Sequence, residues 1–333
     1  VYADRHNHIG AQIYGLMPRR EAGREMAGAF VLPLHEARWQ WQGYLDAQAL
    51  PHEYDPPEGL IVHANQYLPR FLADIYISNR WHAPARALRI RERLADRRDL
   101  CAQDLADIQD DQVDLFARIW LPRLLASLPA SQPVPAALRT WQGDTRETVA
   151  ALLFERWIDG LAQRVLQQRM PARQASDYVN QWPAWRWNLM HVLWGARAWF
   201  SGEEAGQLVR ASLEAALATP QGPAKVVFRH TLRRQRLLRH LFDASHAYAG
   251  GSRETISALR RNVDFLTKGQ GGPVDAAEAA FSFGTSFKLV HDLAPGAQNL
   301  FLANMPNSGR PFTWSLKRQL RRWRQGRRYG IRF

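Results

Sequence analysis

Asn65 is the first residue of this sequence whose type and position suit a reaction. It follows the apolar run from Leu60 to Ala64, which we expect to form a buried strand. A side-chain amide at the end of a strand can be held rigidly and still face a cleft, where its N–H groups donate hydrogen bonds. On these residues alone, an Asn that completes a turn is the simpler interpretation.

Other residues of reactive type lack the spacing that chemistry would need. No two histidines of the first block show the four-residue spacing of a zinc pair on one helix, so we interpret them as structural or surface residues. An acidic stretch in a predicted helix could hold a cation, but a solvated helix face with a few capping carboxylates is the simpler interpretation. Three later serines lack the G-x-S-x-G sequence that surrounds the nucleophile of many serine hydrolases. These residues are His6, His8, His35, His63 and His82; Asp104, Asp107, Asp110, Asp111 and Asp114; and Ser282, Ser286 and Ser308.

The composition indicates a globular chain. With 333 residues, 46% of them hydrophobic, it is long enough to bury a large core and could hold two domains. No apolar run reaches the eighteen or so residues of a membrane-spanning helix, so we expect no membrane span. The single cysteine, Cys101, excludes an internal disulfide and leaves the compartment open.

The net charge of +13 is concentrated near the C-terminus. The tail from Lys317 to Arg332 holds eight basic residues and no acidic one. It could bind phosphates by charge and stack bases on Trp323 or Tyr329, and so act as a non-catalytic binding module for nucleic acid or an anionic surface. A solvated amphipathic helix is the simpler interpretation, and we keep the binding module as the alternative function.

The hydrophobic pattern divides the chain into three regions. Residues 1–83 are rich in predicted strands, residues 84–245 are mainly helical, and residues 246–333 return to strands and a terminal helix from Thr313 to about Gln325. Apolar residues recur every four positions along one predicted helix, and the face that they form is most simply part of the core. It consists of Val149, Leu153, Trp157, Leu161 and Val165. We predict an α+β fold, one discontinuous domain whose two ends meet in the same sheet.

Short motifs occur in a specific order along the chain. They are V-Y-A-D-R-H-N-H-I-G from Val1, G-L-M-P-R-R from Gly15, W-Q-W-Q-G from Trp39, D-P-P-E-G-L-I-V-H-A-N up to Asn65, A-R-A-L-R-I-R-E-R-L from Ala85, A-G-G-S-R-E-T-I-S from Ala249, T-S-F-K-L-V-H-D-L from Thr285 and N-S-G-R-P from Asn307. In this order they resemble the β-subunit of the penicillin acylase (penicillin amidase) family of N-terminal nucleophile hydrolases, over nearly the whole chain.

The resemblance implies an amide hydrolase with a four-layer αββα sandwich and a large helical insertion. In that family an N-terminal Ser of the β-subunit is the nucleophile and its own α-amine, which titrates near neutrality, is the base. Val1 has no nucleophilic atom. We therefore expect a truncated β-subunit, inactive alone, whose partners are the α-subunit and the upstream part of the β-subunit.

The resemblance also implies roles for two residues. Asn65 stands where the family keeps the amide that donates to the oxyanion, and Arg86 matches an Arg that orients the catalytic hydrogen bonds. Without the resemblance, Arg89 would be an equal candidate. Some members bind a structural calcium through a carboxylate after the oxyanion Asn, and Asp74 is the acidic residue nearest to that register; no cofactor is expected for the chemistry.

The substrate class stays open at this point. A β-lactam, an acyl-homoserine lactone and another N-acyl compound all fit the resemblance, and so does a non-catalytic relative that keeps the fold. Bacterial relatives are usually exported, which implies a periplasmic or secreted protein. We expect a small-molecule amide rather than nucleic acid as the ligand.

Overall fold

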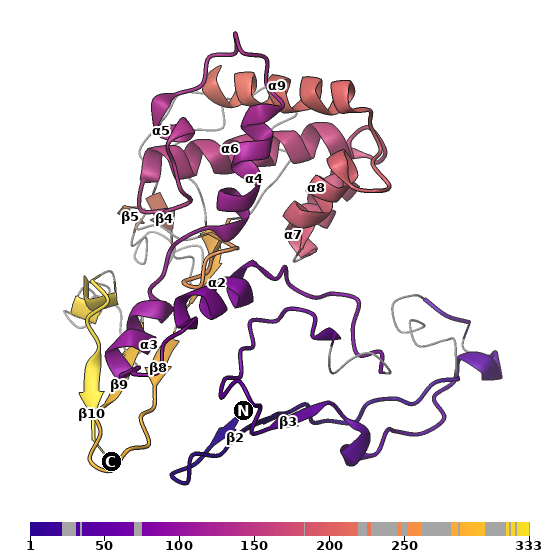
Figure 1. Ribbon diagram of the computed structural model, residues 1–333. Helices are drawn as coiled ribbons and strands as arrows, with labels where there is room; N and C mark the ends of the chain where they lie inside the picture. Colours follow the sequence, from indigo (N-terminus) through magenta and orange to yellow (C-terminus); the bar gives the residue numbers. More distant parts are fainter. Residues whose placement is uncertain are drawn as a thin grey trace, which may run out of the picture.

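The structure, a computed structural model, combines a group of helices with small antiparallel sheets (Figure 1). It describes residues 1–21, 31–33, 35–69, 75–182, 184–218, 225–227, 245–247, 252–261, 281–285, 287–303, 318–319, 321–323 and 325–332. These residues form a mixed α+β structure, as the sequence predicts. No helix among them is long and apolar enough to cross a lipid bilayer.

The middle of the chain is helical as far as Ala218, which confirms the prediction for that stretch. Prolines separate the helices, because Pro135 and Pro171 stand directly before α5 and α7. The helices are α2 (Ala85–Leu94), α3 (Ala102–Gln109), α4 (Leu115–Ala126), α5 (Ala136–Arg139), α6 (Thr148–Leu166), α7 (Ala172–Gln181), α8 (Trp185–Trp194) and α9 (Gly202–Ala218).

Helix α6 is the centre of the main apolar core. It packs against α5, α7, α8 and α9, and its Phe154 and Trp157 are fully buried. The predicted core face is confirmed at four positions, Leu153, Trp157, Leu161 and Val165. Val149 is 56% exposed, so the prediction was wrong there: it lies in the first turn of α6 and projects outside the cluster.

The strands form separate small sheets. The N-terminal sheet has the order β1 (Tyr2–Ala3), β2 (Ile9–Gln12) and β3 (His52–Tyr54), and the C-terminal sheet has the order β10 (Tyr329–Ile331), β9 (Asn299–Ala303) and β8 (Phe287–Val290). Two strand pairs complete the list: β4 (Lys225–Val227) with β5 (Ser245–Ala247), and β6 (Leu259–Arg261) with β7 (Phe281–Gly284). Among the described residues, no pairing joins the two ends of the chain in one sheet.

The segment from Leu60 to Ala64 is not a strand, so this prediction was wrong. Its backbone groups are bonded by side chains instead of by a neighbouring strand. The Gln66 amide accepts from the Ala64 N–H at 2.7 Å and donates to the Val62 carbonyl at 3.1 Å. Val62 and Ala64 are nevertheless buried, in a small cluster with Ala87 of α2. The expected helix is also wrong at residues 225–227, which form β4.

The acidic stretch is not simply a solvated face. The Asp111 and Asp114 side chains are 5% and 1% exposed, because each meets a buried arginine. Asp104 is a capping residue as expected, since its carboxylate accepts from the Cys101 N–H before α3. Asp114 also caps a helix: it accepts from the Ala117 N–H at the start of α4.

Candidate active site

Asn65 and Arg86, which lie 21 positions apart, meet in the structure. The Arg86 Nη2 donates to the Asn65 side-chain oxygen Oδ1 at 2.9 Å and to the Ala64 carbonyl at 2.7 Å. Arg86 lies in the first turn of α2, four positions after His82, which is bridged to Gln66 beside Asn65. The two residues that the sequence singled out for one reaction therefore form one contact.

The backbone holds Asn65 in a turn. Its φ is +64°, in the left-handed region that Asn tolerates better than most residues. The Asn65 carbonyl accepts from the His82 N–H at 2.9 Å, and Gln66 forms a parallel bridge with His82. The turn is therefore fixed from both sides, by the segment that precedes α2 and by the Arg86 side chain.

The contact with Arg86 also fixes the orientation of the Asn65 amide. A guanidinium has only donors, so it bonds the amide oxygen and leaves the Nδ2 group on the other side of the amide. Asn65 is exposed, and no described residue accepts from Nδ2. An oriented, outward-facing N–H donor is the arrangement that stabilises a developing oxyanion.

Arg86 is half-buried, and two effects act on its pKa. Burial lowers the pKa of Arg86, and the carboxylate of Glu254 raises it. An arginine stays charged at neutral pH in either case. The charge strengthens its bond to the Asn65 amide oxygen, because charge-assisted hydrogen bonds are stronger than neutral ones.

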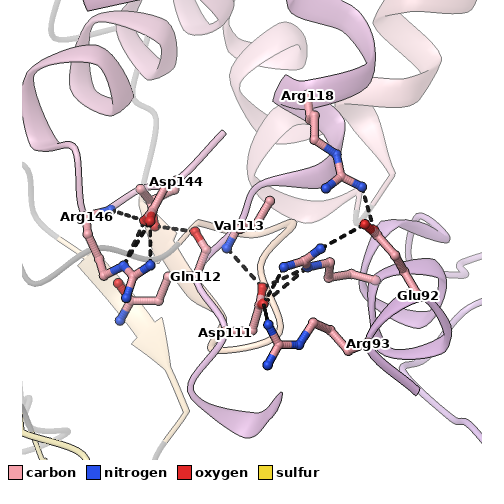
Figure 2. Close-up of polar contacts among 10 residues, drawn as sticks. Glu92, Arg93, Asp111, Gln112, Val113, Arg118, Asp144 and Arg146 are labelled. Atoms are coloured by element: carbon pink, nitrogen blue, oxygen red, sulfur yellow. Dashed lines mark hydrogen bonds and ion pairs between the residues drawn. The ribbon is translucent and has the colours of Figure 1, made fainter. Parts of the chain in front are cut away.

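Without the family resemblance, Arg86 and Arg89 were equal candidates for the site, and the structure distinguishes them by their partners. Arg89 forms a two-point ion pair with Asp111, with its Nε at 3.1 Å from Oδ1 and its Nη2 at 2.7 Å from Oδ2. Figure 2 shows Asp111 in this network, beside Arg93 and the ion pair of Glu92 with Arg118. Arg89 therefore ties α2 to the chain before α4 and does not reach toward Asn65.

A buried charge cluster that joins the start of α4 to α6 and α8 was not anticipated from the sequence. Arg186 of α8 lies 3.5 Å from the Asp114 carboxylate and pairs with Glu155 of α6, and Asp114 also accepts from the Ser252 hydroxyl at 2.6 Å. Glu254 lies two residues further on and is 2% exposed. The only available signal was Asp114 as a helix cap, since nothing marks Arg186 or Glu254 as buried in a single sequence.

The described residues contain no cluster of three or more histidine, cysteine, aspartate or glutamate side chains suited to a metal ion. Asp74, the residue proposed for calcium, lies outside them. The His8 ring nitrogen Nδ1 lies 2.6 Å from the Asp55 carboxylate, and both side chains are partly exposed. Ser286 and Ser308 also lie outside the described residues, and the side chain of Ser282 is not described.

Of the expected terminal helix from Thr313 to about Gln325, residues 318–319 and 321–323 are helical, and Thr313 lies outside the described residues. The basic tail is partly built into the fold, so the expectation that it is solvated was wrong in part. The Arg328 side chain is 4% exposed and donates to the Asp110 carboxylate at 2.6 Å. Of the two aromatic rings that could stack bases, Trp323 lies under the Lys288 amine at 4.8 Å, and Tyr329 lies under the Arg322 guanidinium at 4.0 Å. Both rings already have intramolecular partners.

Comparison with known proteins decides the family. The family model described as penicillin amidase matches residues 1–333. The chain belongs to the penicillin amidase family. An acyl-homoserine lactone acylase, QuiP of Pseudomonas fluorescens, is 36% identical over 160 residues, which are 46% of this chain and 19% of that protein. The penicillin acylase 2 proenzyme of Pseudomonas sp. strain SE83 is 31% identical over 151 residues, 41% of this chain and 19% of that protein.

The fold of this chain is similar to that of a solved penicillin acylase. The thermostable penicillin G acylase of Alcaligenes faecalis superposes with a TM-score of 0.58 at 16% identity, covering 99% of this chain and 63% of that one. The alignments to the curated acylases span about a fifth of their length. The family is therefore shown, whereas the alternative of a binding module receives no support from the comparisons.

Proposed function

We propose that this chain supplies part of the active site of an acylase that cleaves linear amides, with Asn65 as the oxyanion donor and Arg86 as the residue that orients it. The nucleophile would be an N-terminal Ser outside these 333 residues. Its α-amine takes the hydroxyl proton as the hydroxyl oxygen attacks the amide carbonyl carbon, and the carbonyl oxygen becomes an oxyanion that Asn65 Nδ2 stabilises. The C–N bond then breaks, the amine leaves with the proton held by the α-amine, and water hydrolyses the acyl ester.

The contact between Asn65 and Arg86 is the observation that carries this proposal. It holds the amide oxygen at 2.9 Å and so leaves the donor side toward solvent. A turn Asn without a catalytic role would need no charged partner for its side chain. The proposal also explains why Asn65, which is exposed and has a left-handed backbone conformation, is held both by the backbone of His82 and by the Arg86 side chain.

For the substrate, we propose an amide with an apolar acyl group, such as an acyl-homoserine lactone or a penicillin. The names of the relatives support both possibilities. A pocket of about 160 Å³ has a mainly apolar wall that includes His63 and Leu68, on either side of Asn65 along the chain. Its other lining residues are Val1, Ala11, Gln12, Ile13, Pro51, His52 and Glu53. Such an apolar wall suits an acyl chain.

The test uses the complete protein and a panel of N-acyl-homoserine lactones and phenylacetyl amides. Replacing Asn65 by Gly, which keeps the left-handed backbone, should lower kcat roughly 10²- to 10³-fold with little change in KM, as loss of one oxyanion donor does. Asn7→Gly is the matched control, because Asn7 is another exposed Asn with a φ of +67°. Absence of amide cleavage by the unmodified complete protein would refute the proposal.

Processing and location complete the proposal. One relative is named a proenzyme, which supports maturation from a precursor, with an α-subunit and further β-subunit residues as partners. We also propose a periplasmic or secreted location. Cell fractionation together with N-terminal sequencing of the mature chains tests both, and an unprocessed cytoplasmic protein would contradict them.

A further inference from the structure

The pocket on either side of Asn65 contains two imidazole side chains, those of His52 and His63, in a mainly apolar wall. Pockets for small molecules usually combine an apolar wall with a few polar groups that fix orientation and specificity. The polar groups of this wall should therefore decide which acyl groups it accepts.

The pocket lies where the N-terminal sheet meets the Asn65 segment. Gln12 of β2 pairs with His52 of β3, and just beyond this pair the Ile13 N–H donates to the Pro51 carbonyl at 3.0 Å. These four residues line the pocket together with Val1, and Figure 1 shows the N-terminus beside β2 and β3. The sheet end therefore forms one part of the wall, and the chain around Asn65 forms another.

His63 faces the pocket because its neighbours face the other way. Val62 and Ala64 are 6% and 7% exposed and pack in a cluster with Ala87 of α2. His63 lies between them in the chain, is exposed and lines the pocket. Its side chain therefore points away from α2 and toward the space that an acyl group would occupy.

His63 also has a hydrogen bond to offer. Among the residues that the structure describes, none bonds its ring. By contrast, the Gln12 amide donates to the Ala47 carbonyl at 3.3 Å, and Nδ1 of His52 donates to the Leu50 carbonyl at 3.0 Å. An imidazole carries at least one N–H in either protonation state, so His63 can donate to a ligand oxygen at any pH near neutrality.

The separation between His63 and Asn65 limits where on a substrate that donor can act. Two residues of chain span at most about 7 Å between their Cα atoms. With the scissile carbonyl oxygen at Asn65, a donor within that span reaches the first few carbons of the acyl chain and not its far end. An oxygen on the second carbon would already lie within reach of the Asn65 amide. The third carbon is therefore the first position that needs a separate donor.

We propose that His63 is a specificity-determining residue, which donates a hydrogen bond to an oxo or hydroxyl oxygen on the third carbon of the acyl group. This rests on the proposed function, because it takes Asn65 as the oxyanion donor and this pocket as the acyl pocket. The apolar residues of the wall contact the rest of the chain. An unsubstituted chain displaces water from the His63 N–H without replacing its hydrogen bond, which disfavours that chain.

The experiment compares two N-acyl-homoserine lactones of equal chain length in the complete enzyme, one with a hydroxyl on the third carbon and one without. The unmodified enzyme should favour the hydroxylated substrate about tenfold in kcat/KM, as one hydrogen bond allows. His63→Leu should abolish this preference by lowering kcat/KM for the hydroxylated substrate alone. His63→Gln keeps an N–H donor and should retain part of the preference.

His6→Leu is the matched control, because His6 is an exposed histidine that does not line the pocket. It should keep the substrate ratio of the unmodified enzyme. An unmodified enzyme without preference, or a His63→Leu enzyme that keeps the preference, would overturn the proposal. Equal losses on both substrates in His63→Leu would overturn it too, since they would show a structural role.

Binding of the free acids gives a readout that needs no turnover. Calorimetric titration of the complete protein should show about tenfold tighter binding of the acid with a hydroxyl on the third carbon than of the plain acid, and His63→Leu should remove the difference. Such binding without any amide cleavage by the unmodified protein would refute the proposed function and leave the role of His63 in the pocket in place. Amide cleavage with equal binding of the two acids would refute the role of His63 alone.

Discussion

At the scale of single residues, the site depends on how one arginine holds one amide. Arg86 uses the same nitrogen, Nη2, for the Ala64 carbonyl and the Asn65 side chain. A guanidinium suits this half-buried position because it is weakly hydrated and permanently charged, whereas an ammonium is strongly hydrated and is neutralised more readily by burial. The two cations are therefore not interchangeable here.

Arg86→Lys should lower kcat of the complete enzyme by about 10²-fold, which is the order of loss expected when a catalytic group moves by about 1 Å. KM should change little, because the contact orients the donor and does not bind the substrate directly. Steady-state kinetics on an N-acyl substrate measure both constants. Arg91→Lys, on an exposed position of the same helix, is the matched control and should behave like the unmodified enzyme.

Glu254 should make stability depend on pH. The folded pKa of Glu254 is about 7 and its ordinary value is 4.5, so the folded state binds the proton more tightly than the unfolded state does. Its favourable contribution is fully present below pH 4.5 and is lost as pH rises to about 7, a change of at most about 3 kcal/mol. Glu254→Gln should therefore match the unmodified protein at pH 4.5 and be more stable than it at pH 8.

Urea unfolding at the two pH values measures this difference. A Gln variant that is less stable at pH 8 would show that the carboxylate is well compensated in the fold and would contradict the prediction. The expected outcome fits a buried carboxylate with one oxygen that has no hydrogen-bond partner among the described residues.

At the scale of elements, the sequence predicted local structure well where one periodicity dominates. The helices through Ala218 follow from apolar spacing alone. The run from Leu60 to Ala64 has the same apolar character, yet Gln66 bonds its backbone in place of a strand. Whether an apolar run pairs as a strand depends on a distant neighbour, and single-sequence periodicity contains no information on that neighbour.

The same limit applies to buried charge. Lys288 alternates with apolar residues in β8 and would be expected on the solvent side, but it is 6% exposed, paired with Asp110 and placed over Trp323. Burial lowers the pKa of Lys288, while Asp110 raises it. Its partner lies 178 positions away. For Asn65 and Arg86 the family motif gave both positions, but their contact could be seen only in the structure.

The C-terminal strand should depend on one buried ion pair. Arg328 precedes β10 and bonds Asp110, the Ala106 carbonyl and the Gln109 side chain, which attaches β10 to α3. Arg328→Met should lower the free energy of unfolding by about 3 kcal/mol, because it leaves a partly buried carboxylate with one cation fewer. The comparison is with Arg327→Met, an exposed neighbour, by chemical denaturation. Equal effects of the two substitutions would show that the tail is held by charge in general and not by this pair.

At the scale of the whole molecule, the N-terminal part differs from the helical part in what it leaves exposed. The helical region buries most of its large apolar side chains around α6, with Leu88, Ile119 and Val149 among the exceptions. By contrast, residues 1–69 expose Tyr14 at 90%, Leu16 at 75%, Val31 at 103% and Trp41 at 58%. Monomeric proteins seldom leave so much apolar surface in one region unless another chain or segment covers it.

The 333-residue chain produced alone should therefore self-associate and bind the dye ANS, and it should not cleave amides. Production together with the rest of the protein should suppress dye binding and restore cleavage, because the added segments cover the exposed face and supply the nucleophile. Trp41→Lys in the isolated chain should reduce association without restoring activity. Light scattering, ANS fluorescence and an acylase assay measure the three quantities. A monomeric chain with low dye binding would show that this surface needs no cover, and turnover by that chain would place the nucleophile within these residues, against the function proposed here.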